Sequence, residues 1–405
     1  MPPTDVIYLD NHSTTRVDPR VVEAMLPYFV EEYGNPGSSH AFGENASAGV
    51  ERARESIAAN IGAEPREIVF TSGATESNNL ALRGVAERNL RRTKDQRNHF
   101  VSVRTEHKAV LEPLERLAAR GREVTLLDVE PYQSPQAGWL DPEIVAAALR
   151  DETALVSVML ASNEIGVVQP LAEIAELCHR RGVLVHCDAT QAVGKLPVDV
   201  RRLGVDLMSF SAHKIYGPKG VGALFLRRRD SIVRLEPQII GGGQQEGRRS
   251  GTLNAPGIVG FAKALQLCVD ELPIESQRLS SLRQKLFRGL SDRLGEIQLC
   301  GPALTQVDAA GDPLRLPGNL NIALGDIDGE ALLLSMGNLA LSTGATCAST
   351  DPGPSHVLLA LGMTEDLARS SLRFGLGRFN TDVEVATAIE TVAAHVGQLR
   401  QLAAK

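Results

Sequence analysis

A lysine and an aspartate each follow an apolar strand in this sequence, in positions where both could do chemistry. Lys214 ends the run 209–214, a short predicted strand that breaks into a polar turn, and a second apolar strand follows at 221–226. Another predicted strand, 183–186, leads to Asp188. Pyridoxal phosphate requires such a pair, because the lysine forms a Schiff base and the acid pairs with the pyridine nitrogen. On its own Lys214 could be a surface lysine in a turn, but Asp188 and the phosphate-binding elements described below favour the cofactor role.

A phosphate site is indicated by the segment 71–76, Thr-Ser-Gly-Ala-Thr-Glu, which follows a predicted strand and opens a helix. Glycine permits a tight turn, and the free amides of the helix start, with the hydroxyls of Ser72 and Thr75, form an anion site. A simple helix cap would use the same residue types. Ser211 and His213, beside the lysine, could reach the same phosphate, which needs several donors.

Four further polar side chains lie after or within predicted strands. A histidine such as His107 can stack on a planar ring and exchange protons near neutrality, although a lone histidine is often only a surface residue. Asn163 can donate to a cofactor or substrate oxygen, and Gln191, three residues after Asp188, can donate to the ring phenolate. The guanidinium of Arg373 suits a substrate carboxylate, with a structural salt bridge as the alternative.

Cys347 lies in the segment 341–354, which is small, polar and punctuated by glycine and proline. Such a composition predicts a mobile loop. A cysteine on an exposed loop can be a nucleophile, whereas the alternative is a small apolar residue that anchors the loop. The other cysteines fall in predicted helices or strands and are expected to be buried or passive: Cys178, Cys187, Cys268 and Cys300.

Length and composition restrict the class of protein. The chain has 405 residues, so two domains are expected, and its 43% hydrophobic and 22% charged content is ordinary for a soluble globular protein. A net charge of −7 argues against a generally basic nucleic-acid binder. No apolar run is long enough for a transmembrane helix, and the first residues lack the pattern of a signal peptide. Five cysteines without paired spacing favour a reducing cytoplasm.

Helix-like and strand-like segments alternate as far as residue 226, which predicts βαβ units and a doubly wound, mostly parallel sheet. Ligands of such sheets bind at the carboxyl ends of the strands. A glycine-rich loop, 241–251, then leads to a long predicted helix, 256–294, and to a smaller α/β segment, with a domain boundary near Gly260. The other predicted helices lie at 19–29, 50–61, from 76, from 109, near 143 and at 171–181, and the other strands at 67–70, 100–103, 123–127 and 154–160.

Taken together, these segments resemble the cysteine desulfurases of the NifS/IscS type, in the class V aminotransferase family with fold type I. The resemblance covers nearly the whole chain, and the motifs are very specific in this order although each is only moderately specific alone. They are 8–11, 34–36, 70–79 (Phe-Thr-Ser-Gly-Ala-Thr-Glu-Ser-Asn-Asn), 105–107, 163–166, 188–191, 211–217, 249–252, Cys347 and 373–378.

The resemblance implies an enzyme that uses pyridoxal phosphate to take sulfur from L-cysteine, leaving L-alanine and a persulfide on Cys347. Lys214 would carry the cofactor and remove the α-proton, and His107 would stack on the ring and assist acid–base steps. Asp188 and Gln191 would bind the ring nitrogen and the phenolate oxygen. The remaining roles would be phosphate binding by Ala74 (backbone), Thr75, Ser211 and His213, contact of Thr252 with the phosphate of the other subunit in a homodimer, and substrate carboxylate binding by Asn163 and Arg373.

The implied fold is α/β, with a mostly parallel seven-stranded sheet between helices in a large domain, 15–260. A smaller C-terminal α/β domain, 1–14 with 261–405, would carry the cysteine loop. Acceptors of sulfur in the family include iron–sulfur scaffold proteins and tRNA thiolation proteins, and Cys347 could transiently ligate an iron–sulfur cluster shared with a scaffold. Neither a membrane nor direct binding of nucleic acid is expected.

The sequence departs from the family pattern at three places. Residues 342–347 read Ser-Thr-Gly-Ala-Thr-Cys rather than Ser-Ser-Gly-Ser-Ala-Cys, His12 follows Asn11 where alanine is common, and Cys187 replaces an apolar residue. These changes keep the catalytic set and put the choice of acceptor in doubt. The length of the stretch 348–350 favours the long-loop NifS/IscS branch over the short-loop SufS branch.

Three other functions stay open at this point. A selenocysteine lyase would share the whole scaffold. An aminotransferase or another lyase of the superfamily would not need Cys347. A non-catalytic sulfur-assembly subunit is expected to lack Lys214 or Asp188, and both are present.

Overall fold

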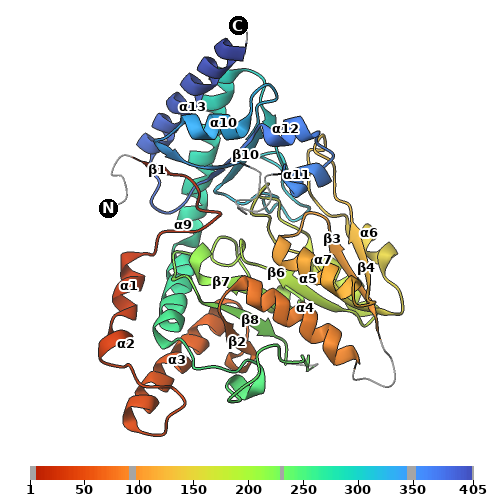
Figure 1. Ribbon diagram of the computed structural model, residues 1–405, viewed down its shortest axis with the longest axis vertical. Coiled ribbons are helices and arrows are strands. Elements are labelled where there is room, and N and C mark those ends of the chain that lie inside the picture. The colour runs from red at the N-terminus through yellow and green to blue at the C-terminus, as the bar shows by residue number, and fades with distance from the viewer. Residues whose placement is uncertain (1–5, 91–96, 229–231, 344–352, 404–405) are drawn as a thin grey trace.

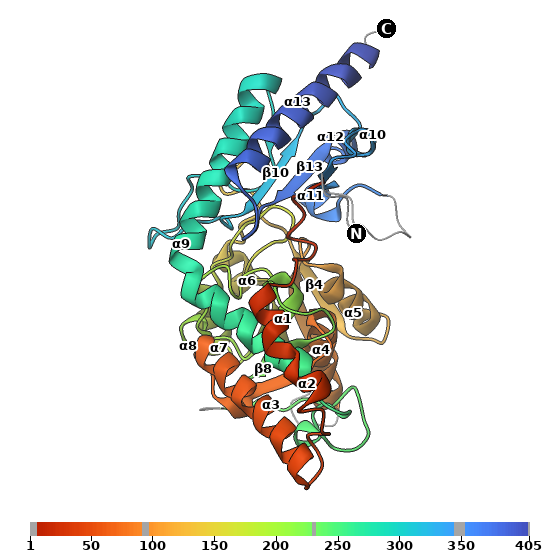
Figure 2. The same ribbon diagram turned by 90° about the vertical axis from the view of Figure 1, so that its left-hand side faces the viewer.

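The computed structural model describes residues 6–90, 97–228, 232–343 and 353–403. A larger body with a seven-stranded sheet lies below a smaller body in Figure 1, and helix α9 (Ala255–Leu294) runs from one into the other. Figure 2 shows α9 along one side of the molecule, with helices α1 to α3 beside its lower half. None of the described helices is both long and apolar enough to cross a membrane.

The large sheet has the strand order β2-β8-β7-β6-β5-β3-β4. The four pairs among β7, β6, β5, β3 and β4 are parallel, whereas β8 is antiparallel to both of its neighbours. The predicted mostly parallel seven-stranded sheet is therefore confirmed. The strands are β2 Ile68–Thr71, β3 His99–Val103, β4 Glu123–Leu127, β5 Thr153–Ser157, β6 Leu184–Asp188, β7 Leu207–Ser211 and β8 Gly222–Leu226.

Helices cover both faces of this sheet. Successive residues of a strand point to opposite faces, so adjacent residues of one strand pack against different helices. In β5, Val156 packs into a cluster with α3 (Ala41–Asn60), α7 (Leu171–Arg180) and the first part of α9. The next residue back, Leu155, packs into a second cluster with α4 (Ala74–Leu90) and α5 (Lys108–Ala118). The other helices of this body are α1 Pro19–Met25, α2 Pro27–Val30, α6 Pro142–Ala148 and α8 Val200–Leu203.

The smaller body has an antiparallel sheet of order β12-β13-β10-β9 and a parallel pair, β1-β11. Its apolar cluster includes Leu9 and the second part of α9, from Leu279 to Leu294, while Cys268 and earlier residues of α9 belong to the larger body. Pro273 lies between the two parts of the helix. The elements are β1 Ile7–Tyr8, β9 Gln298–Leu299, β10 Asn319–Ala323, α10 Gly329–Ser335, β11 Leu339–Ala340, β12 Ser342–Thr343, α11 His356–Ala360, α12 Glu365–Arg369, β13 Ser371–Gly375 and α13 Asp382–Ala403.

Several predicted bounds differ from the structure, among them those of the first predicted helix, helix α3 and strand β5. The helix predicted at 19–29 is two helices, because Pro27 cannot donate a backbone hydrogen bond and starts a new turn after Leu26. Helix α3 begins nine residues before the predicted residue 50, with His40 as its cap. Strand β5 ends at Ser157 rather than at 160, although Val158 still donates to a β6 carbonyl.

Candidate active site

A cavity of about 480 Å³ lies where β6 and β7 end, at the carboxyl edge of the parallel sheet. Arg373 and Thr252 are not among its lining residues, and Cys347 lies outside the described residues. The structure thus brings nine of the twelve predicted site residues together: Ala74, Thr75, His107, Asn163, Asp188, Gln191, Ser211, His213 and Lys214.

Lys214 enters this cavity from a short 3-10 turn, Ala212–Lys214, directly after β7. Its Nζ donates to the backbone carbonyls of His12 at 2.7 Å and Ser13 at 2.6 Å. Burial, and then the positive charge of Arg373, lowers the pKa of Lys214 to about 8. A measurable fraction of the amine is therefore neutral near pH 7, as a nucleophile or a base requires.

Asp188 is the last residue of β6 and is 6% exposed. One carboxylate oxygen accepts a hydrogen bond from Asn78 at 2.7 Å, and the other accepts one from the backbone of Thr190 at 3.0 Å. These bonds orient the carboxylate in the cavity wall. Burial, and then the charge of Asp188, raises the pKa of the neighbouring Glu106 well above its usual range.

His107 caps helix α5, and its Nδ1 accepts a hydrogen bond from the backbone of Ala109 at 3.0 Å. The hydrogen of the neutral ring therefore lies on Nε2. Burial is the main cause that lowers the pKa of His107, and Lys214 acts in the same direction. A neutral ring in the cavity wall suits stacking on a flat ligand.

The predicted phosphate site combines a helix start with side chains from β7 and the turn after it. Ala74 is the first residue of α4, so the first backbone amides there have no partner within the helix. A Cβ atom on Gly222 of β8 would lie 2.6 Å from Cα of Gly73, so strand and turn pack as closely as glycine allows. Burial, and then Lys214, lowers the pKa of His213 to about 4, so its ring is neutral.

Two of the predicted site residues, Arg373 and Thr252, do not line the cavity. Arg373 in β13 pairs with Asp10 at 3.0 Å, donates to Ser13 Oγ at 2.7 Å and reaches the carbonyl of Asn163 at 3.4 Å. The salt-bridge alternative is therefore observed, at a point that adjoins the cavity through Asn163. Thr252 is exposed and lines a different hollow of about 490 Å³.

Residues that the sequence reasoning missed support the predicted ones. Asn78, which holds Asp188, lies one turn after Ala74 and so shares its helix face, a spacing that could have identified it. Lys195 contacts Gln191 from four residues further along the chain, a spacing that could also have identified it, whereas His12 contacts Gln191 across 179 residues and gave no such signal.

The residues fit pyridoxal phosphate. The cavity is lined by a helix start that can bind an anion, by a carboxylate at a strand end and by a lysine. Buried polar atoms with no partner in the described part of the chain remain at Asn78 Oδ1 and Thr190 Oγ1, on the two residues that hold Asp188. The four described cysteines are all buried and free, as predicted: Cys178, Cys187, Cys268 and Cys300.

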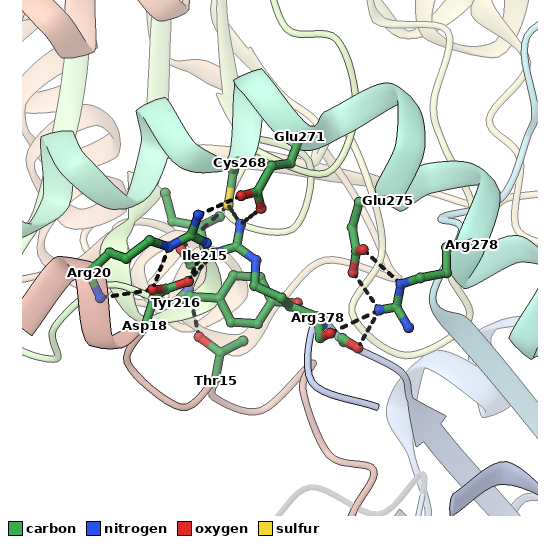
Figure 3. A network of polar contacts seen from close by, with 11 residues as sticks. Thr15, Asp18, Arg20, Ile215, Tyr216, Cys268, Glu271, Glu275, Arg278 and Arg378 are labelled. Carbon is green, nitrogen blue, oxygen red and sulfur yellow. Dashed lines mark hydrogen bonds and ion pairs between the residues drawn. The ribbon is translucent and has the colours of Figure 1, made fainter. Parts of the chain in front are cut away.

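Figure 3 shows a network of ion pairs and hydrogen bonds around Tyr216, which lies two residues after Lys214. Tyr216 adopts a φ of 64°, and its hydroxyl accepts from the backbone of Arg378 at 2.7 Å. The guanidinium of Arg378 lies 4.4 Å from the centre of the Tyr216 ring and pairs with Asp18 at 2.6 Å and Glu271 at 3.0 Å. This network fixes the lysine turn of the larger body to the strand end of the smaller one.

Comparisons with known proteins identify the family of the chain. The family described as Aminotransferase class-V matches residues 7–387. The chain is 50% identical over 397 residues to cysteine desulfurase IscS of Anaeromyxobacter dehalogenans (strain 2CP-C), with 98% of this chain and 94% of the relative covered. The chain therefore belongs to the aminotransferase class-V family and, within it, to the enzymes called cysteine desulfurases.

Solved structures lead to the same class. A NifS-like protein superposes with a TM-score of 0.87 at 37% identity, covering 97% of this chain and all of the other. A structure of SspA in complex with cysteine superposes with a TM-score of 0.76 at 34% identity, covering 92% of this chain and 99% of the other. The predicted α/β fold of the NifS type is thus confirmed.

Proposed function

We propose that this chain removes sulfur from L-cysteine, releases L-alanine and keeps the sulfur as a persulfide on Cys347, with pyridoxal phosphate as its cofactor. The observation that carries the proposal is the meeting of Lys214 and Asp188 in one cavity, beside the helix start at Ala74. The relative solved with bound cysteine supports the choice of substrate.

The residues that line the cavity support the following roles. Lys214 would attach the cofactor, Asp188 would face its ring nitrogen and Gln191 its ring oxygen, and His107 would cover the ring. The first amides of α4, the Thr75 and Ser211 hydroxyls and His213 would hold the phosphate. When bound, the cofactor supplies an electron sink for the carbanion that forms at the substrate α-carbon.

The chain's own groups then move protons and hold the substrate. Lys214 takes the α-proton, since its lowered pKa leaves a neutral amine available near neutrality. Arg373 and Asn163 would hold the substrate carboxylate, and Arg373 would exchange part of its contact with Asp10 for that ligand. The Cys347 thiolate attacks the substrate sulfur, so the S–Cβ bond breaks and the sulfur remains on the enzyme.

We also infer that two copies assemble and that the sulfur goes to an acceptor protein, such as an iron–sulfur scaffold or a tRNA thiolation protein. Cys347 would transiently share an iron–sulfur cluster with a scaffold. The exposure of Thr252 away from its own cavity, and the exposed apolar residues Phe29 and Val30 on α2, support a homodimer. Free, buried cysteines in the described part support the reducing cytoplasm.

The two-domain division is part of the proposal. Residues 15–260 would form the cofactor domain, and residues 1–14 with 261–405 the domain of the cysteine loop. The two apolar clusters support this division, although along α9 they separate between Cys268 and Leu279 rather than at Gly260. Limited proteolysis that yields fragments cut elsewhere would contradict it.

The test is an absorbance spectrum of the purified protein before and after L-cysteine, with alanine and sulfide assayed. A yellow band that changes on cysteine, with alanine formed, is the expected result. Absence of a band after pyridoxal phosphate is added would overturn the role of Lys214. A Cys347→Ala variant is expected to keep the band and lose turnover, and full activity in that variant would point to another lyase. The same assays with selenocysteine in place of cysteine compare turnover of the two substrates. Analytical ultracentrifugation measures whether the protein is a dimer.

A further inference from the structure

The side-chain amide of Gln191 is held at three points, and two of them belong to His12. Oε1 of Gln191 accepts from Nζ of Lys195 at 2.6 Å and lies 3.1 Å from Nδ1 of His12. Nε2 of Gln191 donates to the backbone carbonyl of His12 at 2.9 Å. A single residue thus contacts both ends of the amide, and its ring is one of the departures from the family pattern.

The hydrogen-bond pattern defines the state of the His12 ring. An amide oxygen can only accept, so Nδ1 of His12 must carry a hydrogen. Burial is the main cause that lowers the pKa of His12 well below its usual range, and the charges of Lys195 and Arg373 act in the same direction. The ring is therefore neutral and has its one hydrogen on Nδ1. Its Nε2, which in this tautomer carries no hydrogen, is buried and has no partner within the described ranges.

This pattern leaves one orientation for Gln191. Rotating the amide by half a turn would set Oε1 against the His12 carbonyl and Nε2 against two donors, Lys195 Nζ and His12 Nδ1. In the observed orientation one N–H of Nε2 donates to His12, and the amide has a second N–H. Because Gln191 lines the cavity, this second N–H is the group that it can offer to a ligand there.

The same carbonyl of His12 also accepts from Nζ of Lys214, at 2.7 Å. His12 therefore joins the lysine and the glutamine that flank the cofactor site. It is 2% exposed, so its position is set by packing rather than by solvent.

We propose that His12 and Lys195 are positioning residues that fix the orientation of the Gln191 amide. In this orientation the amide oxygen contacts His12 and Lys195, and one N–H is free to donate to the cofactor ring oxygen. The proposal rests on the proposed function, because it concerns how this chain presents Gln191 to pyridoxal phosphate. A donor to that oxygen draws charge from it and weakens its hold on the Schiff-base proton. Loss of this fixed orientation therefore raises the pH at which the lysine-bound cofactor loses this proton.

The test is a pH titration of the absorbance band of the loaded protein. His12→Ala keeps the backbone carbonyl and removes only the ring donor, and we expect its midpoint to rise by about 0.5 to 1 unit. His12→Asn restores a side-chain donor and is expected to return the midpoint toward that of the parent protein. Gln191→Leu sets the upper limit of the shift. Ser276→Ala is the matched control, since Ser276 lines the same 30 Å³ cavity as His12 and Lys195, and it is expected to leave the midpoint unchanged.

An unchanged midpoint in His12→Ala would overturn the proposal, and so would an equal shift in all of these variants, which would indicate general repacking. A parent protein that never shows the band would instead refute the proposed cofactor. A second measurement needs neither cofactor nor a stable alanine variant. Nitrogen NMR of histidine-labelled, cofactor-free protein, with His12→Asn to assign the signal, should show a neutral ring protonated at Nδ1 across pH 6 to 9. A ring protonated at Nε2 would contradict the fixed orientation.

Discussion

The turn that carries Lys214 has a cation on each side, and the two cations differ in the charge of their partners. On the cavity side, Nζ of Lys214 donates to two neutral carbonyls, and no carboxylate lies within ion-pair distance of it in the described part of the chain. On the other side, Arg378 has two carboxylates, Asp18 and Glu271, and the Tyr216 ring. A buried cation whose hydrogen-bond partners are all neutral loses its proton at a lower pH, whereas a cation that pairs with two carboxylates stays charged and joins the segments that carry them.

Removing the cavity-side cation is expected to have the largest effect on activity and little on stability. Lys214→Ala should lower kcat/KM for alanine formation by at least about 10⁴-fold, since both covalent attachment and proton transfer are lost. Its melting temperature without cofactor should not fall, because burial and the positive charge of Arg373 disfavour the ammonium group at this position. The surface variant Lys285→Ala, which breaks an exposed pair with Asp382, serves as control and should keep full activity. A cofactor-free Lys214→Ala protein that melts well below the parent would contradict the comparison.

The opposite result is expected on the far side of the turn. Arg378→Met should reduce the free energy of unfolding by about 1.5–3 kcal/mol, because the buried carboxylate of Asp18 loses one of its two guanidinium partners and keeps only Arg20. Urea denaturation measures the change. Arg400→Met breaks an exposed pair with Asp326 and should cost less than about 1 kcal/mol. Equal midpoints for the two variants would show that the buried network does not fix the turn.

A smaller effect separates two adjacent asparagines of helix α4. Asn78→Ala removes the donor to Asp188 and should lower kcat/KM by about 10- to 100-fold, the equivalent of one hydrogen bond to a charged group. Asn79→Ala removes only a bond to the backbone of Thr75 and should leave kcat/KM close to that of the parent. Steady-state assays at saturating cofactor make the comparison, and equal losses in both variants would indicate damage to the helix instead.

The cavity side could be predicted from the sequence to the extent that its residues follow strands. Asp188, Ser211 and Lys214 lie where apolar strands end, and parallel strands bring those ends to one edge of the sheet. Local pattern alone was enough to place them together. The long helix α9 was likewise visible as an uninterrupted helical pattern and begins one residue before the predicted start.

The supporting contacts made by His12 and Arg373 could not be predicted, because they join segments that are far apart in the chain. His12 meets Gln191 across 179 residues, and Arg373 meets Asp10 across 363. The pairing of Arg373 depends on how the chain before residue 14 packs against β13, and no periodicity in either segment encodes that packing. Helix bounds were missed where one residue decides them, as at Pro27.

The last effect is on stability as a function of pH in the cofactor-free protein. Burial is the main cause that lowers the pKa of Lys214 to about 8 and that of Lys195 to about 7. The unfolded chain keeps these protons to a pH above 10, so between about pH 7 and pH 10 it binds more protons than the folded protein. Stability should therefore rise with pH in this window, through the contribution of these two lysines.

Urea denaturation of the double variant Lys195→Met with Lys214→Met can isolate this contribution. At pH 6, where both lysines are charged in the folded parent, the double variant should be more stable than the parent, and the gap should narrow steadily toward pH 10. Lys285→Met, which changes an exposed lysine, should run parallel to the parent over the same range. A difference in the free energy of unfolding that stays constant with pH would mean that Lys195 and Lys214 keep their protons in the folded protein. The contrast between the two sides of the turn would then rest on geometry alone.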